Sequence, residues 1–242
     1  MDRKTYMRDV YSKYWITARE KRYGVSFYDD LMCNYINETL PKNQRILEAA
    51  IGTGIPFSDF LQKKEHNIYG IDIAPRLVDK CRELNESIKC SVGDVESMEF
   101  EDNFFDCVFC FHSTWYFPNI YIAIDEMIRV AKPNGLVIFD IQNADNFYVN
   151  KAHNRRVFRS KGSGIFIQFI FNIAKFLLQR GALNWRGIIH EVPSYPQEIS
   201  AHLEENVESI EWFIMSDSSK LEICDDFSKL KNYEKITFVV RK

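Results

Sequence analysis

The stretch that decides the fold is Arg45-Ile46-Leu47-Glu48-Ala49-Ala50-Ile51-Gly52-Thr53-Gly54-Ile55. A short apolar run ends in an acid, breaks into a Gly-x-Gly turn and restarts as a helix-like segment, which predicts strand, tight loop and helix. Glycine lets the backbone of such a loop approach a ligand closely, and the N-terminus of the following helix offers free N–H groups. The pattern alone is typical of many nucleotide sites, so the flanking residues must decide between them.

Strand-like and helix-like segments alternate after this stretch. Apolar runs that predict strands lie at 45–50, 68–73, 88–92, 105–111 and 136–141, and helical patterns lie at 55–64, 75–86 and 120–131. This order predicts βαβ units and a parallel sheet. The turn Pro133-Asn134-Gly135 leads into the fifth strand. Two further β-rich runs, at 208–215 and 235–241, bring the predicted sheet to seven strands.

The chain divides into four parts around this core. Residues 1–40 hold two helix-like pieces, Asp9–Lys21 and Phe27–Leu40, and are expected to form an N-terminal helical lid. Residues 41–143 are predicted to be the cofactor-binding core and 144–192 an insertion on the substrate side. Residues 193–242, with a helix at Gln197–Asn206, are predicted to complete the same sheet.

The insertion combines positive charge with apolar side chains. Residues 151–161 hold five positive charges and no acid, and an apolar run from Ile165 to Leu178 follows. Polar residues interrupt this run, and it is too short to span a membrane, so no transmembrane segment is expected. It could serve as a subunit contact, giving a homodimer through 165–178, or as a membrane-surface contact.

Composition excludes several classes of protein. The chain has 242 residues, a formal net charge of −3 and a pI of about 6.0, which argues against a general nucleic-acid binder. Cys107 and Cys110 form a C-x-x-C pair, but they lie in a predicted strand, where positions three apart face opposite sides. We therefore expect buried thiols and no metal site. The N-terminus leads into no apolar signal region, so a reducing cytoplasm is expected.

Three acids stand where successive predicted strands end. Glu48 ends the first strand, Asp72 ends the second, and Asp94 follows the third. The carboxyl ends of strands in a doubly wound sheet meet along one crevice, which is where ligands bind. A carboxylate after the second strand can accept hydrogen bonds from both ribose hydroxyls, in a nicotinamide dinucleotide as well as in S-adenosylmethionine.

The charge of Glu48 separates these two cofactors. A dinucleotide would bring two phosphate charges to the glycine loop, where Glu48 would repel them, whereas S-adenosylmethionine brings an ammonium and a sulfonium. The third glycine of the dinucleotide fingerprint is also missing, because Phe57 stands in its place. The sequence thus disfavours phosphate at this loop.

These residues resemble the class I S-adenosylmethionine-dependent methyltransferase family, of the small-molecule type. Five parts of the family pattern occur in order over residues 43–143: Ile46–Gly54, Gly70–Pro75, Gly93–Glu96, Phe105–Val108 and Arg129–Gly135. One departure is Ala50, which replaces the usual first glycine and could tighten or shift the loop. The resemblance implies an α/β, Rossmann-like, doubly wound fold with a mostly parallel seven-stranded sheet, helices on both faces and an inserted helical or lid region.

The resemblance also implies which residues hold S-adenosylmethionine and its product S-adenosylhomocysteine. Glu48 and the Gly52–Gly54 loop would hold the methionine end, Asp72 the ribose, and Asp94 with the Val95 backbone the adenine. Neighbouring positions predicted to line the same site are Ala50, Ile73 and Phe111. Arg19, beside Tyr14 on the N-terminal lid, could pair with the cofactor carboxylate, although a solvated helix residue is the commoner role for such an arginine.

The acceptor side is less defined by the sequence. His112 follows the fourth strand and is a candidate base, with a hydrogen-bonded, pocket-lining histidine as an equal alternative. His190, on a predicted extended segment at 184–192, is a second candidate. Trp115 and Tyr116 could cover the cofactor or cradle the substrate, against core packing as the default. Arg155, Arg156 and Arg159 could hold an anionic group of the substrate.

The predicted activity is transfer of a methyl group to a hydroxyl or amine of a small, anionic metabolite, with sugars or cell-surface precursors as the class suggested by analogy. The chain lacks the signature motifs of DNA methylases after the fourth strand. Two rivals remain open. One is a nicotinamide-dependent oxidoreductase, and the other is a non-catalytic methyltransferase-like partner protein.

Overall fold

The structure, a computed structural model, describes residues 2–11, 26–160, 191–215 and 220–242, together with Phe166, Phe169, Ile170 and Ile173. Within these residues one sheet has eight strands in the order β3-β2-β1-β4-β5-β8-β6-β7. The strands are β1 (Arg45–Ala49), β2 (Asn67–Asp72), β3 (Lys89–Val92), β4 (Phe105–Cys110), β5 (Ala131–Gln142), β6 (Ser209–Met215), β7 (Leu221–Ile223) and β8 (Lys235–Arg241). The first five run parallel to one another, β8 pairs antiparallel with β5, and β6 pairs antiparallel with both β8 and β7.

The sheet therefore has eight strands in place of the seven predicted, while its mostly parallel, doubly wound character is confirmed. The additional strand is β7, which pairs with the end of β6 at the edge of the sheet. Its three residues are too few to show an alternating pattern. The fifth strand also starts earlier than predicted. Its register with β4 jumps between Ala131 and Leu136, and the turn residue Asn134 adopts a φ of 60° within this irregularity.

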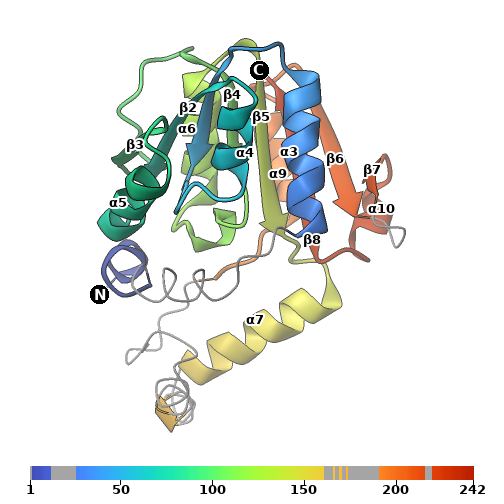
Figure 1. The fold of residues 1–242 in the computed structure, drawn as a ribbon. Coiled ribbons are helices and arrows are strands. Elements are labelled where there is room, and N and C mark those ends of the chain that lie inside the picture. The colour runs from blue at the N-terminus through green and yellow to red at the C-terminus, as the bar shows by residue number, and fades with distance from the viewer. Residues whose placement is uncertain are drawn as a thin grey trace.

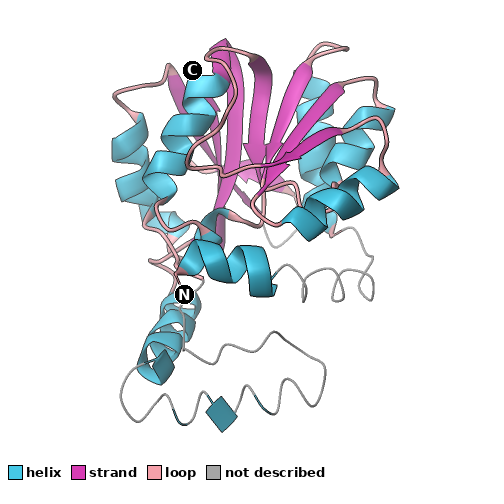
Figure 2. Ribbon diagram, turned by 90° about the vertical axis from the view of Figure 1, so that its left-hand side faces the viewer, coloured by secondary structure: helices cyan, strands magenta, loops and turns pink. Residues whose placement is uncertain are grey.

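Helices cover both faces of the sheet (Figures 1 and 2). One face packs against α3 (Phe27–Thr39), α4 (Phe57–Lys63) and α5 (Pro75–Leu84). The other face packs against α6 (Ile120–Val130), α9 (Pro196–Leu203) and α10 (Phe227–Leu230). Two buried apolar clusters fill these two layers. Cys107 belongs to the first cluster and Cys110 to the second, which confirms that the pair faces opposite sides of β4.

Local sequence explains where several helices begin. Ser26 and Asp29 form a capping box at the start of α3, in which each side chain accepts a hydrogen bond from the other residue's backbone N–H. Pro75 occupies the first turn of α5, where its missing N–H costs nothing. The side chain of Asn119 accepts from the first N–H groups of α6. These caps fix the loops that carry the site.

The remaining elements lie near the carboxyl ends of the parallel strands. The N-terminal residues form the short helix α1 (Arg3–Tyr6) and a π-helical turn η1 (Met7–Tyr11), and a 3-10 turn η2 (Thr114–Tyr116) follows β4. Helix α7 (Phe147–Ser160) follows β5 and projects away from the two layers (Figure 1). The sequence pattern did not predict α7. Most of the predicted helix Asp9–Lys21 and of the extended segment 184–192 lies outside the described residues.

Among the residues that the structure describes, no helix is long and apolar enough to cross a membrane.

Candidate functional site

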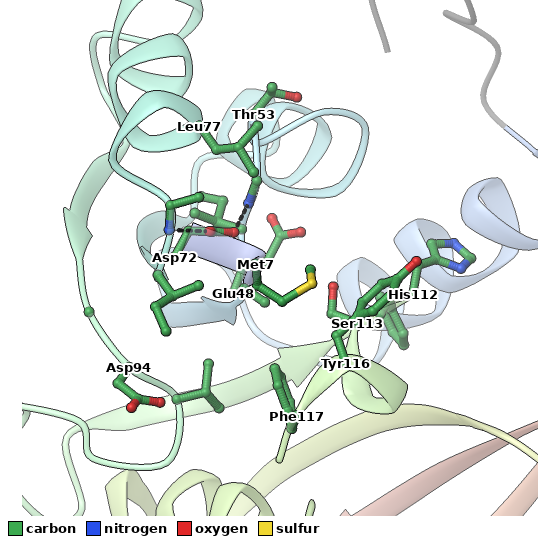
Figure 3. Close-up of a pocket in the computed structure, with 18 of the residues that line it drawn as sticks. Met7, Glu48, Thr53, Asp72, Leu77, Asp94, His112, Ser113, Tyr116 and Phe117 are labelled. Atoms are coloured by element: carbon green, nitrogen blue, oxygen red, sulfur yellow. Dashed lines mark hydrogen bonds between the residues drawn. The ribbon is translucent and has the colours of Figure 1, made fainter. Parts of the chain in front are cut away.

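A cleft opens at the carboxyl ends of the parallel strands, as the strand-end acids predicted (Figure 3). It holds about 1000 Å³ of space between atoms, part of it open solvent. Asp94 lies at one end of the cleft and His112 with Ser113 and Tyr116 at the other (Figure 3). The glycine loop and the second strand-end acid, Asp72, lie between them.

The loop after β1 bends through three left-handed residues. Ala50, Gly52 and Gly54 have φ angles of 60°, 58° and 76°. A side chain at Gly52 would meet nothing within 4 Å, so its backbone faces the open cleft, whereas a Cβ at Gly54 would lie 3.0 Å from Cys81 Sγ. Ala50 adopts the left-handed conformation that favours glycine, so its methyl group strains the turn.

Asp72 ties this loop to the end of β2. Its Oδ2 accepts from the N–H of Gly52 at 2.9 Å and its Oδ1 from the N–H of Ala74 at 2.9 Å (Figure 3). Burial raises the pKa of this carboxyl to about 6, although the two N–H donors act in the opposite direction. Each oxygen keeps acceptor capacity beyond these bonds, so ribose hydroxyls can still donate to it.

Glu48 reaches the cleft from the end of β1. Its carboxylate is buried and accepts a hydrogen bond of 2.5 Å from the hydroxyl of Ser58, in the first turn of α4. Phe57 stands one residue before Ser58, packed against Phe111 at 4.7 Å between ring centroids. The position at which a dinucleotide-binding loop has its third glycine is therefore filled by the packed ring of Phe57.

At the other end, Asp94 is held by the N-terminal segment. Lys4 Nζ lies 2.5 Å from Asp94 Oδ2 and 2.7 Å from Glu96 Oε2, and the Glu96 N–H donates to Asp94 Oδ1. Arg3 donates to the carbonyl of Phe117, and Met7 points into the middle of the cleft (Figure 3). Residues 3–7 therefore close one side of the cleft, next to the carboxylate predicted to bind adenine.

The charges in the cleft suit a cationic ligand. Its described lining includes four carboxylates and one ammonium: Glu48, Asp72, Asp94, Glu96 and Lys4. A diphosphate at the loop would face this excess of negative charge, whereas an ammonium or sulfonium would be attracted by it. The residues present therefore fit S-adenosylmethionine, with Glu48 beside the loop, Asp72 in the middle and Asp94 at the far end. Val95, Ile73 and Phe111 supply apolar walls.

His112 is the centre of a hydrogen-bonded network at the acceptor end. Its Nε2 lies 2.7 Å from Asp29 Oδ1, and Lys235 Nζ lies 2.8 Å from its Nδ1. Since an ammonium only donates, Nδ1 accepts, and Nε2 carries the proton shared with Asp29. Burial is the largest single effect on Asp29 and acts to raise its pKa, but the interactions with His112 and Ser26 together outweigh it and lower that pKa.

Two further groups complete the network. Asp140, fully buried on β5, accepts from the His112 N–H at 2.8 Å and lies 3.1 Å from Lys235 Nζ. The same ammonium lies 4.1 Å from the ring centroid of Tyr28, a cation–π contact. Both ring nitrogens of His112 therefore already have partners, and His112 could act as a base only after one of them moves away.

The other predicted acceptor residues are distributed unevenly. Tyr116 lines the cleft, whereas Trp115 is buried behind it, with its ring 6.4 Å from that of His112. Arg155 and Arg156 lie on α7, away from the cleft lining, and Arg156 forms an ion pair of 2.6 Å with Glu191. Four predicted groups fall outside the description: Tyr14, Arg19, His190 and the side chain of Arg159.

Sequence reasoning missed five residues that shape the site: Lys4, Met7, Asp29, Asp140 and Lys235. Asp140 follows the pattern of an acid near the end of a predicted strand and could have been found in that way. Asp29 belongs to the capping-box pattern Ser26-x-x-Asp29, which marks a helix start and not a site, and Lys4, Met7 and Lys235 lie in segments without a recognisable signal. No cluster of metal-ligating side chains occurs in the described ranges.

Comparison with known proteins agrees with this geometry. Residues 47–139 match a family model described as a methyltransferase domain. The chain is 30% identical over 106 residues to 2-methyl-6-phytyl-1,4-hydroquinone methyltransferase of Synechocystis, a match that covers 42% of this chain and 33% of that protein. It is 24% identical over 110 residues to malonyl-[acyl-carrier protein] O-methyltransferase of Erwinia billingiae, covering 46% and 43%.

The fold as a whole also has solved counterparts. An S-adenosylmethionine-dependent methyltransferase from Thermotoga maritima superposes with a TM-score of 0.58 at 13% identity, covering 90% of this chain and 89% of that one. This chain spans less than half the length of the two curated relatives, so the likeness is strongest for the cofactor-binding core. Residues 47–139 thus match a methyltransferase domain, the fold is that of solved S-adenosylmethionine-dependent methyltransferases, and the residues of the cleft fit this cofactor.

Proposed function

We propose that the protein is an S-adenosylmethionine-dependent methyltransferase that moves a methyl group to a hydroxyl or amine of a small acceptor. The observation that carries this proposal is the carboxylate-lined cleft around the left-handed loop. Its shape accepts a nucleoside, and its charge favours a cation over a diphosphate.

Different residues of the core bind different parts of the cofactor. Glu48 and the N–H groups of the Gly52–Gly54 loop hold the methionine end. Asp72 accepts from the ribose hydroxyls while it keeps the loop in shape through the Gly52 N–H. Asp94 accepts from the adenine amine once Lys4 gives way. The bound cofactor supplies an intrinsically reactive methyl group.

The acceptor end then has mainly to align the nucleophile. Correct placement can lower the barrier by roughly 7–11 kcal/mol in favourable cases. An amine needs only to arrive uncharged, whereas a hydroxyl needs a base. His112 is the candidate base, and His190 is a second candidate. Both ring nitrogens of His112 are already hydrogen-bonded, to Asp29 and Lys235, which favours a role in positioning the acceptor when the acceptor is an amine.

The acceptor is expected to be small and anionic, with sugars and cell-surface precursors as the class proposed by analogy. The two relatives named above act, by their names, on a hydroquinone and on a malonyl-carrier protein, so similarity alone does not select one class. Tyr116 is proposed to flank the acceptor, with Trp115 packed behind it, and Arg156 and Arg159 are proposed to attract its charge; Arg155 lines a separate groove on α7. All six cysteines are buried and free, which suits a reducing compartment such as the cytoplasm.

Two measurements test this function. Calorimetry should show binding of S-adenosylhomocysteine and none of NADH; the reverse result would overturn the cofactor assignment in favour of an oxidoreductase. The protein is then incubated with methyl-labelled S-adenosylmethionine and with aqueous and lipid fractions of a cell extract. Label should enter an extract component with wild-type protein and not with Asp72→Ala. Tight cofactor binding without any transfer would support the non-catalytic alternative.

A further inference from the structure

The charge of the chain is divided sharply between the insertion and the remainder. Residues 146–190, the insertion without Asp145 and Glu191 at its two ends, contain eight Lys and Arg and no Asp or Glu, so the other residues carry 23 basic against 34 acidic side chains. A strongly positive segment in a negative protein indicates a surface for an anionic partner, because it would attract that partner while the body repels it.

Helix α7 displays this charge beside exposed aromatic rings. Phe147, Tyr148 and Phe158 are 65%, 69% and 64% exposed, far more than is usual for such side chains. Lys151 and Arg155 lie with Phe147 and Phe158 along one shallow groove on the outer side of the helix, and Lys151 Nζ is 5.2 Å from the Phe147 ring centroid.

The opposite side of α7 is less exposed. Val149, His153 and Val157 recur at helical spacing and are half-buried. The exposed face of the helix thus carries basic and aromatic side chains together. Beyond it, Phe166 and Ile170 are also exposed, at 68% and 53%. A basic face with Phe and Ile side chains is the composition of helices that lie in the headgroup region of anionic membranes.

We propose that α7 docks the protein on an anionic lipid surface, with Phe147, Tyr148 and Phe158 inserted among the acyl chains and Lys151 and Arg155 against the headgroups. In this arrangement the helix lies on the lipid surface and does not cross the membrane. A second copy of this chain fits the face poorly, because a two-fold contact would bring identical positive faces together. A nucleic acid would neutralise the charges but would leave apolar side chains such as Ile170 in water.

The docked helix would bring the cleft to the membrane. Arg156 pairs with Glu191 at 2.6 Å, and the hydroxyl of Tyr116, which lines the cleft, donates to the same carboxylate at 3.5 Å. These contacts connect α7 to a residue that lines the cleft. If the proposed function holds, the acceptor is therefore an amphipathic molecule that is presented from the lipid surface rather than from bulk water.

The test is co-sedimentation of the full chain with vesicles. We expect binding to phosphatidylcholine vesicles that contain phosphatidylglycerol, weakening as salt is raised, and little binding to pure phosphatidylcholine. Two variants address the two components: Phe147→Ser/Phe158→Ser removes the rings and Lys151→Glu/Arg155→Glu reverses the charges. Each should lower the partition coefficient by about tenfold or more, since each cation near such a surface contributes roughly a fivefold factor and each inserted ring at least as much.

Matched controls carry the same kinds of change elsewhere. Lys42→Glu/Lys229→Glu reverses two exposed charges, and Ile122→Ser/Ile223→Ser removes two exposed apolar side chains outside the insertion. Both should bind vesicles like the wild type. Binding of S-adenosylhomocysteine, measured on every variant, shows that each is folded.

Several results would overturn the proposal. They are absence of binding to anionic vesicles, or binding that the α7 variants leave unchanged. Dimerisation of the free protein that both α7 variants abolish, without vesicle binding, would assign the face to a second copy. Binding of an oligonucleotide in preference to vesicles would assign it to nucleic acid. Vesicle binding does not depend on methyl transfer, so a protein that binds vesicles but transfers no methyl group would contradict only the proposed function.

Discussion

Acidification should weaken cofactor binding through Asp72. Its carboxyl is buried, and burial raises its pKa from 3.8 to about 6, a difference worth about 3 kcal/mol between its two protonation states. In the free protein, this shift makes the native state relatively more stable below pH 4, and that advantage is lost as the pH rises through 6. Ribose hydroxyls donate to the ionised form, so bound cofactor should favour loss of the proton.

The expected result is an affinity that is constant above pH 7 and falls below pH 6. If the proton and the cofactor compete fully, each further unit of acidification costs about tenfold, because the ionised fraction falls tenfold. Isothermal titration calorimetry with S-adenosylhomocysteine between pH 5 and pH 7.5 measures this, since the ligand's own groups do not titrate in that range. Runs in buffers of different ionisation enthalpy should show proton release near pH 5.5.

Asp72→Asn is the control variant. Its amide keeps one oxygen and leaves either the Gly52 or the Ala74 N–H facing a donor, which costs about 1–3 kcal/mol, so binding should be weaker at every pH. Its pH dependence should be flat between 5 and 7.5. An affinity of the wild type that does not change over this range, or one that rises on acidification, would refute the reasoning.

Three other substitutions test the loop and its closure. Ala50→Gly relieves a φ of 60° that costs about 1–2 kcal/mol and adds about 0.5–1 kcal/mol of glycine entropy, so urea unfolding should show a gain of up to about 1 kcal/mol; a loss would contradict the strain. Gly70→Ala would place a Cβ 2.3 Å from Ile51 Cδ1 and 2.9 Å from its Cβ, and should lower the free energy of unfolding by about 1–3 kcal/mol; an unchanged unfolding curve would count against this packing. Lys4→Met removes the ammonium that competes for Asp94, so S-adenosylhomocysteine should bind up to about fivefold more tightly; weaker binding would show that Lys4 helps to hold the ligand instead.

Much of the core could be predicted from the sequence because its signals are local. Strands β1 to β4 follow apolar runs, and Glu48, Asp72 and Asp94 mark where three of them end or turn. The topology then brings these acids together without further information, since parallel strands share one carboxyl edge. The departure at position 50 is visible in the sequence, but only the structure shows that Ala50 adopts a left-handed φ of 60°.

The acceptor end could not be predicted because its contacts are long-range. His112 meets Asp29 from the start of α3 and Lys235 from the last strand; the capping-box pattern of Asp29 indicates only a helix start, and Lys235 stands in no recognisable pattern. Helix α7 was not predicted because its exposed face is basic and aromatic, so the sequence shows no apolar stripe at helical spacing. The edge strand β7 is too short for any periodic signal.

The placement of Cys107 and Cys110 on opposite faces of β4 has a practical use. Both thiols are fully buried, and burial raises the pKa of each, so neither should react with an alkylating reagent while the layers stay closed. Modification at Cys107 would report exposure of the layer under α3 and α4, and modification at Cys110 exposure of the layer under α6 and α9. Mass spectrometry of the labelled peptide could thus time the opening of each side of the molecule separately, with two natural probes three residues apart.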